Sequence, residues 1–159
     1  MIIIFTDGSA RGNPGPGGWG AIVAYEDKVV ELGGREEFTT NNKMELMACI
    51  KALESLSLDS TSTLYSDSTY VVKGMTEWRY GWETNGWKNA SKKPVENQDL
   101  WKRLIQAATG KHIAWRVIAG HAGIAANERC DVIATSYADN EPVSLYDGDR
   151  KGYPTGFEI

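Results

Sequence analysis

The sequence lacks the features that mark a membrane-spanning, exported or disulfide-stabilised protein. None of its apolar runs approaches the length of a membrane span, and its start has neither the basic region nor the long apolar stretch of a signal peptide. Its two cysteines, Cys49 and Cys130, fall in helical patterns and are too few for a disulfide framework. We therefore expect a soluble cytoplasmic protein without membrane contact, with both thiols reduced and buried.

Positive charge is also scarce. The chain has 17 Lys and Arg against 21 Asp and Glu, a formal net charge of -4. A polyanionic partner would feel no overall attraction, so any nucleic-acid surface must be local. Internal repeats and interdomain linkers are absent, and 159 residues suit one domain. We expect this domain to span residues 1–139 and an irregular, partly disordered tail to span residues 140–159.

Two predicted strands end in the same way. Ile2–Phe5 is an unbroken apolar run, typical of a strand covered on both faces, and it leads into Thr6 and Asp7. A second strand, predicted over residues 62–67, ends in Asp67. If the two strands lie side by side in parallel, their carboxylates sit a few ångströms apart. That arrangement is unfavourable unless a cation or a shared proton intervenes.

The segment after the first strand, residues 8–18, is a glycine-rich loop that formally matches the G-x-G-x-x-G dinucleotide-binding spacing. That motif requires a helix directly after it. The residues that follow, Trp19–Tyr25, are instead typical of a strand, and with Val29–Leu32 they predict an antiparallel hairpin. A dinucleotide site is therefore rejected.

A helix is predicted from about Asn42 to Ser57. At about 100° per residue, Glu45 falls on the apolar stripe of this helix, whereas Lys51 lies opposite. An ionised carboxylate on a buried face needs a partner or a proton. Position alone leaves two interpretations open: a buried functional carboxylate, or a first-turn glutamate that faces solvent and favours the helix dipole.

Aromatic rings alternate with charged residues over residues 77–88, which contain three tryptophans and end in Lys88. Such a segment suits a surface that stacks on bases or sugars and neutralises phosphate. The same rings also fit a local mini-core that holds a protruding helix and loop. The sequence leaves both interpretations open.

The C-terminal half predicts a helix over Gln98–Ala108, a strand over His112–Ile118 and a helix over Ala126–Ala138. Asn97 is predicted to cap the first of these helices. Asp131 lies at the edge of the apolar stripe of the last helix. His121 lies in a loop of small residues just before that helix, a placement that suits a proton carrier.

Four acids thus stand at the edges of the predicted core: Asp7, Glu45, Asp67 and Asp131. Oxygen-only ligands favour hard cations such as Mg²⁺ or Mn²⁺, and the lack of a Cys/His grouping argues against zinc. Two such ions, about 3.5–4 Å apart, can activate a water and stabilise the departing oxygen of a phosphodiester. The acids therefore predict hydrolytic phosphoryl transfer.

Five motifs follow one another along the chain. They are Phe5–Ser9 with Gly12–Gly18, Thr40–Ala48, Ser66–Ser68, Gly86–Lys88 with Lys92–Val95, and Gly120–Gly123 with Asn127–Asp131. In these motifs the chain resembles the bacterial type 1 ribonuclease H family from Ile4 to about Ala138. The resemblance implies an α/β, ribonuclease H-like fold: a five-stranded mixed sheet, order 3-2-1-4-5, with helices on both faces.

The resemblance implies an endoribonuclease that hydrolyses the RNA strand of RNA–DNA hybrids by two-metal-ion cleavage and leaves 5′-phosphate and 3′-hydroxyl ends. It further implies a monomer that uses Mg²⁺, with Mn²⁺ as a substitute, to remove primers and R-loops. The metal ligands of the family fall on the four acids above. Its mobile histidine, which assists proton transfer or product departure, falls on His121.

The resemblance also places the contacts to the hybrid. Contacts to RNA sugar hydroxyls fall on Asn13, Asn41 and Asn42, since short amides both donate to and accept from a 2′-OH. The DNA-phosphate pocket falls on Thr40 and Asn97, the aromatic DNA groove on Tyr70 and Trp78, and a basic contact on Lys88.

Several positions depart from the family pattern. Phe38 stands where close relatives tend to carry an arginine, so the phosphate pocket lacks a guanidinium unless Arg35 supplies one. Thr69 replaces a frequent glutamine, and Glu83 and Glu96 dilute the positive charge of the protruding segment. We expect weaker hybrid binding and a shallower decline with salt than in a more basic relative.

Two other functions compete with this one. A non-catalytic nucleic-acid-binding module on the same fold would have lost its acids, whereas all four are present. A DNA junction-cutting or transposase-type nuclease needs additional DNA-binding parts or dimerisation. The compact chain and its sugar-hydroxyl contacts favour RNA instead.

Overall fold

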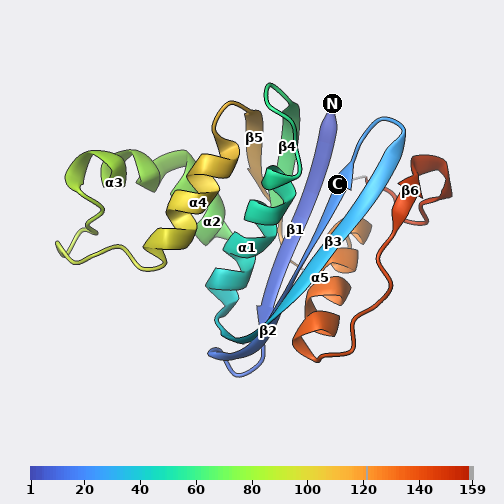
Figure 1. The fold of residues 1–159 in the computed structure, drawn as a ribbon, viewed down its shortest axis with the longest axis horizontal. Helices are drawn as coiled ribbons and strands as arrows, with labels where there is room; N and C mark the ends of the chain where they lie inside the picture. Colours follow the sequence, from blue (N-terminus) through green and yellow to red (C-terminus); the bar gives the residue numbers. More distant parts are fainter. Residues whose placement is uncertain (121, 158–159) are drawn as a thin grey trace.

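The computed structural model describes residues 1–120 and 122–157 of the chain (Figure 1). The strands are β1 (Ile2–Ala10), β2 (Gly15–Ala24), β3 (Lys28–Thr39), β4 (Thr61–Ser66), β5 (His112–Val117) and β6 (Asp147–Asp149). The helical elements are α1 (Asn41–Glu54), α2 (Thr69–Lys73), the π-helical turn η1 (Gly74–Trp78), α3 (Arg79–Asn85), α4 (Gln98–Ala108), α5 (Ala125–Ala138) and the 3₁₀ turn η2 (Arg150–Gly152).

The strands form one mixed sheet in the order β5-β4-β1-β2-β3-β6. Strand β1 pairs in parallel with β4 and antiparallel with β2. The predicted order of five strands is therefore confirmed. Much of the glycine-rich segment predicted as a loop is in fact strand, because β1 extends to Ala10 and β2 begins at Gly15.

A sixth strand corrects the five-stranded prediction. β6 pairs antiparallel with the outer edge of β3, so the segment after residue 139 is not irregular throughout. Its sequence, Asp-Gly-Asp, has no strand propensity, and backbone pairing alone forms it. We had no local signal for this strand, since the residues that pair with it lie more than a hundred positions earlier.

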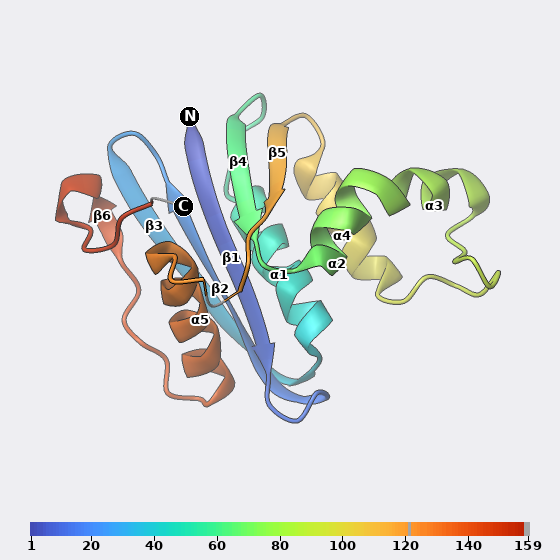
Figure 2. The same cartoon turned by 180° about the vertical axis from the view of Figure 1, so that it is seen from behind.

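Helices cover both faces of the sheet, α1 on one side and α5 on the other (Figures 1 and 2). Successive residues of β1 point to opposite faces. Ile4 accordingly packs in the core beneath α1, whereas Phe5 packs in the core beneath α5. The prediction of a strand covered on both faces is confirmed, and it explains the unbroken apolar run at the start of the chain.

The segment α2–η1–α3 extends away from the sheet and packs against α4 (Figure 1). Trp82 lies 5.1 Å from Trp101 and 5.8 Å from Trp87, measured between ring centroids. Trp82 and Trp87 pack against the main core beneath α1, which includes Trp101, so these rings hold the protruding segment without forming a separate local core. Trp78 remains 40% exposed at its edge.

Within the described part of the chain, no helix combines the length and the apolar character needed to cross a membrane. Both cysteines are free and buried, as predicted.

Candidate active site

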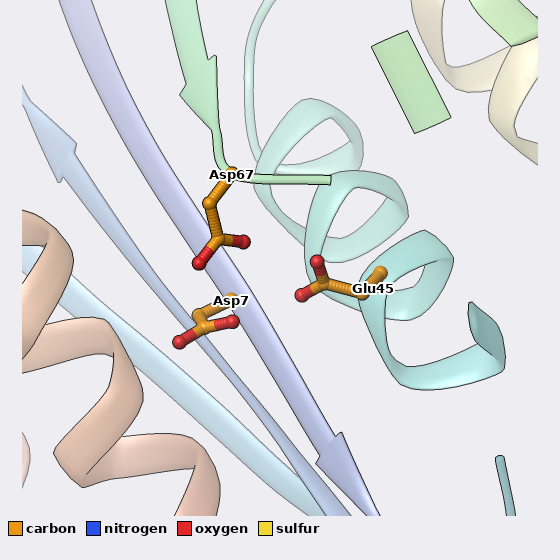
Figure 3. A group of neighbouring side chains, drawn as sticks. All are labelled: Asp7, Glu45 and Asp67. Atoms are coloured by element: carbon orange, nitrogen blue, oxygen red, sulfur yellow. The ribbon is translucent and has the colours of Figure 1, made fainter. Parts of the chain in front are cut away.

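Three carboxylates from distant parts of the chain converge at the end of β4. In the parallel pairing of β1 with β4, Thr6 lies opposite Ser66, so the next residues, Asp7 and Asp67, are neighbours. Glu45 reaches them from α1 (Figure 3). One carboxylate oxygen from each of the three acids lies within 4.8 Å of the others. The predicted convergence of Asp7, Glu45 and Asp67 is confirmed.

The start of α1 is fixed beside β1, which places Glu45 at this site. The side chain of Thr40 accepts a hydrogen bond from the Lys43 backbone N–H at 3.2 Å and caps the helix. A Cβ atom on Gly8 would lie only 2.3 Å from the Glu45 backbone nitrogen. Gly8 therefore allows α1 to approach the strand directly after Asp7, where a larger residue would push the helix away.

Burial and mutual repulsion shift the protonation of these acids. Burial, followed by the charge of Asp67, raises the pKa of Asp7 from 3.8 to about 7. Burial and the charge of Asp7 raise the pKa of Glu45 well above its ordinary value. Glu45 is 9% exposed, and its Oε1 atom is buried without a hydrogen-bond partner. The solvent-facing interpretation of Glu45 is therefore wrong.

The donor set fits a hard divalent cation. All three groups offer carboxylate oxygens, which Mg²⁺ and Mn²⁺ prefer, and a cation between them would relieve the repulsion that raises their pKa values. The unpartnered Glu45 Oε1 also gains a partner in such a site. The site is thus chemically incomplete without positive charge.

Asp131 approaches this triad from α5. Its charge contributes to the raised pKa of Asp7, although it lies outside the group of three acids within 4.8 Å. On the loop that precedes α5, a Cβ atom on Gly120 would lie 3.2 Å from Asp67 Oδ2, so this loop passes close to the site. His121, the predicted proton carrier, lies outside the described residues.

A groove of about 530 Å³ contains most of the predicted substrate contacts. It is lined by Asn13, Thr40, Asn41, Asn42, Lys43, Glu96 and Asn97. Two loops are tied together there: the Asn41 backbone N–H donates to Asn13 Oδ1 at 2.9 Å, and the Ala10 N–H donates to Asn41 Oδ1 at 2.7 Å. Amide groups are thereby held in one polar groove beside α1.

The sequence model of the family described as RNase H matches residues 1–139. The chain belongs to the ribonuclease H family. Among its curated relatives, Ribonuclease HI of Caulobacter vibrioides is 54% identical over 133 residues, which cover 84% of this chain and 89% of that protein. Ribonuclease H of Caulobacter sp. (strain K31) is 53% identical over 133 residues, with 84% and 86% covered.

Solved ribonucleases H share this fold. LC9-RNase H1, a type 1 RNase H with the type 2 active-site motif, superposes with a TM-score of 0.82 at 33% identity, covering 92% of this chain and 77% of that one. LC11-RNase H1, solved in complex with an RNA/DNA hybrid, has a TM-score of 0.66 at 25% identity, covering 88% and 98%. The sheet order and the flanking helices are thus those of the family.

Tyr70 and Trp78, the aromatic residues predicted to contact DNA, lie next to the groove in this ribonuclease H. Asn97 Nδ2 donates to Tyr70 Oη at 3.1 Å, and the Tyr70 ring lies 6.1 Å from Trp78 at an angle of 64°. Asn97 occupies the N-cap position of α4, as predicted, but its side chain makes no capping bond and is directed to Tyr70 instead. Lys88 lies farther out, in a short bridge with Pro94.

Arg35 does not replace the missing arginine. A Cβ atom on Gly33 would contact Tyr137 of α5, so Arg35, two residues farther along β3, faces the same side of the sheet. Glu36 and Phe38 instead line a second groove of about 360 Å³, which shares Lys43 and Asn97 with the first. Phe38 is 77% exposed there, so this ribonuclease H has a phenyl ring at the position where relatives tend to carry an arginine.

One lining residue was missed in the sequence. Lys43 lies in both grooves, in the first turn of α1 directly after Asn41 and Asn42. A cation next to two amides in a polar first turn was an available signal for anion binding.

Proposed function

We propose that this ribonuclease H cleaves the RNA strand of RNA–DNA hybrids with two divalent ions, Mg²⁺ or, as a substitute, Mn²⁺, and leaves 5′-phosphate and 3′-hydroxyl ends. The observation that carries the proposal is the convergence of Asp7, Glu45 and Asp67 within 4.8 Å at a site where Asp7 and Asp67 raise the pKa of Glu45. Removal of primers and R-loops follows from that activity.

The proposed metal ligands are the triad and Asp131. The charges of both Asp67 and Asp131 raise the pKa of Asp7, which supports a shared role of these acids in holding divalent ions. When bound, the ions supply an activated water and stabilise the departing oxygen. Buried on rigid elements, Asp7 and Glu45 hold their oxygens in place before substrate arrives.

Selection of the hybrid is assigned to the grooves beside α1. Asn13, Asn41 and Asn42 are proposed to contact RNA 2′-hydroxyls, because amides both donate and accept. Thr40 and Asn97 are proposed to hold a DNA phosphate. Their position in one groove supports this assignment.

The remaining roles are assigned outside the grooves. Tyr70 and Trp78 would pack against the DNA strand, and Lys88 would neutralise a phosphate farther along it. His121 is proposed to assist proton transfer or product departure. A monomer in the cytoplasm remains the expectation from the sequence.

A labelled RNA–DNA hybrid tests the proposal. We expect cleavage of the RNA strand with Mg²⁺ or Mn²⁺, none with EDTA, and none of a DNA–DNA duplex of the same sequence. Asp59→Asn, a change at an exposed aspartate, is the matched control and should cleave normally. Equal cleavage of the DNA duplex would instead favour a sugar-nonspecific nuclease, and hybrid binding without cleavage would favour a non-catalytic module.

A further inference from the structure

A second buried carboxylate, Glu31 of β3, lies away from the triad and is fully partnered. Arg129 of α5 donates from Nε to Glu31 Oε2 at 2.8 Å and from Nη2 to Oε1 at 2.9 Å. Tyr153 Oη donates to Oε2 at 2.6 Å, and the Tyr146 backbone N–H donates to Oε1 at 2.9 Å. A carboxylate has about four lone-pair sites. All of them are therefore used by α5 and by the segment after it.

That segment, residues 144–157, is called the C-terminal strap here. It begins where the Ser144 carbonyl accepts a second bond from Arg129 Nη2, at 3.0 Å, and it includes β6 on the edge of β3. The family match ends at residue 139, before the strap begins. The strap thus lies beyond the family match, whereas Glu31 and Arg129, to which it is anchored, lie within it.

Aromatic rings of the strap cover the core beneath α5. Tyr146 lies 5.0 Å from Tyr153, and Tyr153 stacks on Phe157 at 5.7 Å with an angle of 1°. Phe157 lies 6.4 Å from Phe5, and Phe5 lies 5.1 Å from Tyr65. Phe5 and Tyr65 are each two residues before an aspartate of the triad. The strap therefore packs directly behind the two strands that carry Asp7 and Asp67.

Helix α5 depends on such contacts for its position. Its first turn has no side-chain cap, since Ile124 occupies the N-cap position. Arg129 and Asp131 are two residues apart, about 200° around the helix, so Arg129 is anchored on one side while Asp131 is presented on the other. With side chains reaching roughly 5–6 Å from the helix axis, a rotation of about 20° would move Asp131 by about 2 Å.

We propose that the C-terminal strap and the Glu31–Arg129 pair form a positioning device that sets the rotation of α5 and thereby fixes how Asp131 is presented toward the triad. Arg129 and Tyr153 are its positioning residues, because they act on the metal site through α5 and do not touch substrate. The inference rests on the proposed role of Asp131 as a metal ligand.

Point variants test this device, because deletion of the strap would expose the core beneath it. Arg129→Lys keeps the charge and loses the two-pronged bond, and Tyr153→Phe keeps the ring and loses one donor. Arg103→Lys is the control, since Arg103 makes a two-pronged pair with Glu54 between α4 and α1 at a more exposed position. These three variants and the unmodified protein are compared well below their melting temperatures.

Two measurements separate positioning from simple stability. In the metal-free proteins, amide hydrogen exchange over residues 125–131 should rise about tenfold in Arg129→Lys and less in Tyr153→Phe, with no change in Arg103→Lys. In Arg129→Lys, the Mg²⁺ concentration needed for half-maximal cleavage should rise about tenfold, and the Mg²⁺ affinity measured by calorimetry should fall about tenfold. KM for the hybrid should stay within about twofold, since the substrate grooves are untouched.

The outcomes are distinguishable. If Arg129→Lys melts earlier but exchanges at residues 125–131 and responds to Mg²⁺ as Arg103→Lys does, the strap serves stability alone and the inference is overturned. If the unmodified protein itself shows no Mg²⁺ response, the proposed function fails. The exchange measurement then still decides whether the strap fixes α5.

Discussion

Two glutamates in the same small domain are almost equally buried and behave in opposite ways. Glu31 is 3% exposed and Glu45 is 9% exposed. Burial alone would raise the pKa of Glu31, but hydrogen bonds from Arg129, Tyr153 and the Tyr146 backbone outweigh it, and the pKa is lowered. Glu45 has acids as neighbours, and its pKa is raised. Burial therefore does not decide the role of a carboxylate; its partners do.

Glu31 is thus a structural carboxylate that ties elements together, whereas Glu45 is available to bind a ligand. The Glu31 carboxylate has no lone pair left for a ligand. Glu45 keeps a buried oxygen unpartnered at a cost in stability that persists only where the surrounding fold enforces it. This contrast leads to four predictions, from the largest expected effect to the smallest.

Asp7→Asn should abolish cleavage at the site formed by Asp7, Glu45 and Asp67. Because changing even an indirect supporting partner of a metal costs about 10–100-fold, loss of a direct ligand should reduce cleavage by more than about 100-fold. Hybrid binding in EDTA should persist or improve, since one negative charge near the phosphate is removed. Cleavage assays and a metal-free binding titration check both parts. Retained cleavage would remove Asp7 from the site.

The same substitution at the two glutamates should change stability in opposite directions. Glu31→Gln breaks a buried ion pair and should lower the free energy of unfolding by about 3 kcal/mol. Glu45→Gln removes a buried carboxyl group whose ionised form is disfavoured by burial and by Asp7, and should raise the free energy of unfolding by about 1 kcal/mol in metal-free protein at pH 8. Urea unfolding in EDTA measures both. A loss of stability in both variants would contradict the contrast.

The pH dependence of metal-free stability should follow the triad. The pKa of Asp7 is raised from 3.8 to about 7, so its folded state favours the proton and its contribution to stability is lost as pH rises through about 7. Glu31, with a lowered pKa, is ionised in both states above about pH 5.5 and adds no slope there.

We therefore expect a lower free energy of unfolding at pH 8 than at pH 5.5, by an amount on the order of a few kcal/mol. Adding Mg²⁺ should stabilise the protein more at pH 8, and Asp7→Asn should flatten the profile. Urea unfolding at the two pH values, with and without Mg²⁺, gives the answer. A flat profile in the unmodified protein would mean that the acids are not coupled.

Phe38→Arg should have the smallest effect. It adds a cation to the groove that Phe38 lines, outside both carboxylate clusters. Hybrid affinity should rise a few-fold, and the slope of log affinity against log salt should steepen by about one. Phe38→Gln controls for loss of the ring. An unchanged slope would mean that no phosphate reaches this groove. The dependence of metal-free stability on pH should be the same in both variants.

Sequence patterns predicted the parts of this protein that local signals encode. Asp7 and Asp67 were found because each comes shortly after an apolar run that predicts a strand, and periodicity placed Glu45 on an apolar face. What periodicity could not decide was whether Glu45 faces a partner or solvent, because that depends on neighbours from other elements.

Glu31 was missed for the same reason. It is a single charge in an apolar strand, and Arg129, which neutralises it, lies 98 positions away. The partners that decide the state of a buried charge are non-local, so neither the strap nor β6 could be recognised from residues 140–159 alone. The groove contacts were accessible through the family resemblance, whereas the direction of Arg35 depended on the register of β3.

The parallel pairing of β1 with β4 has a consequence for the newly synthesised chain. Thr6 and Ser66 are sixty positions apart, so the pairing can form only after the intervening hairpin and α1 have been synthesised. A nascent or partly folded chain therefore cannot bring the carboxylates of Asp7 and Asp67 together. Nucleolytic capacity therefore emerges only with the finished domain.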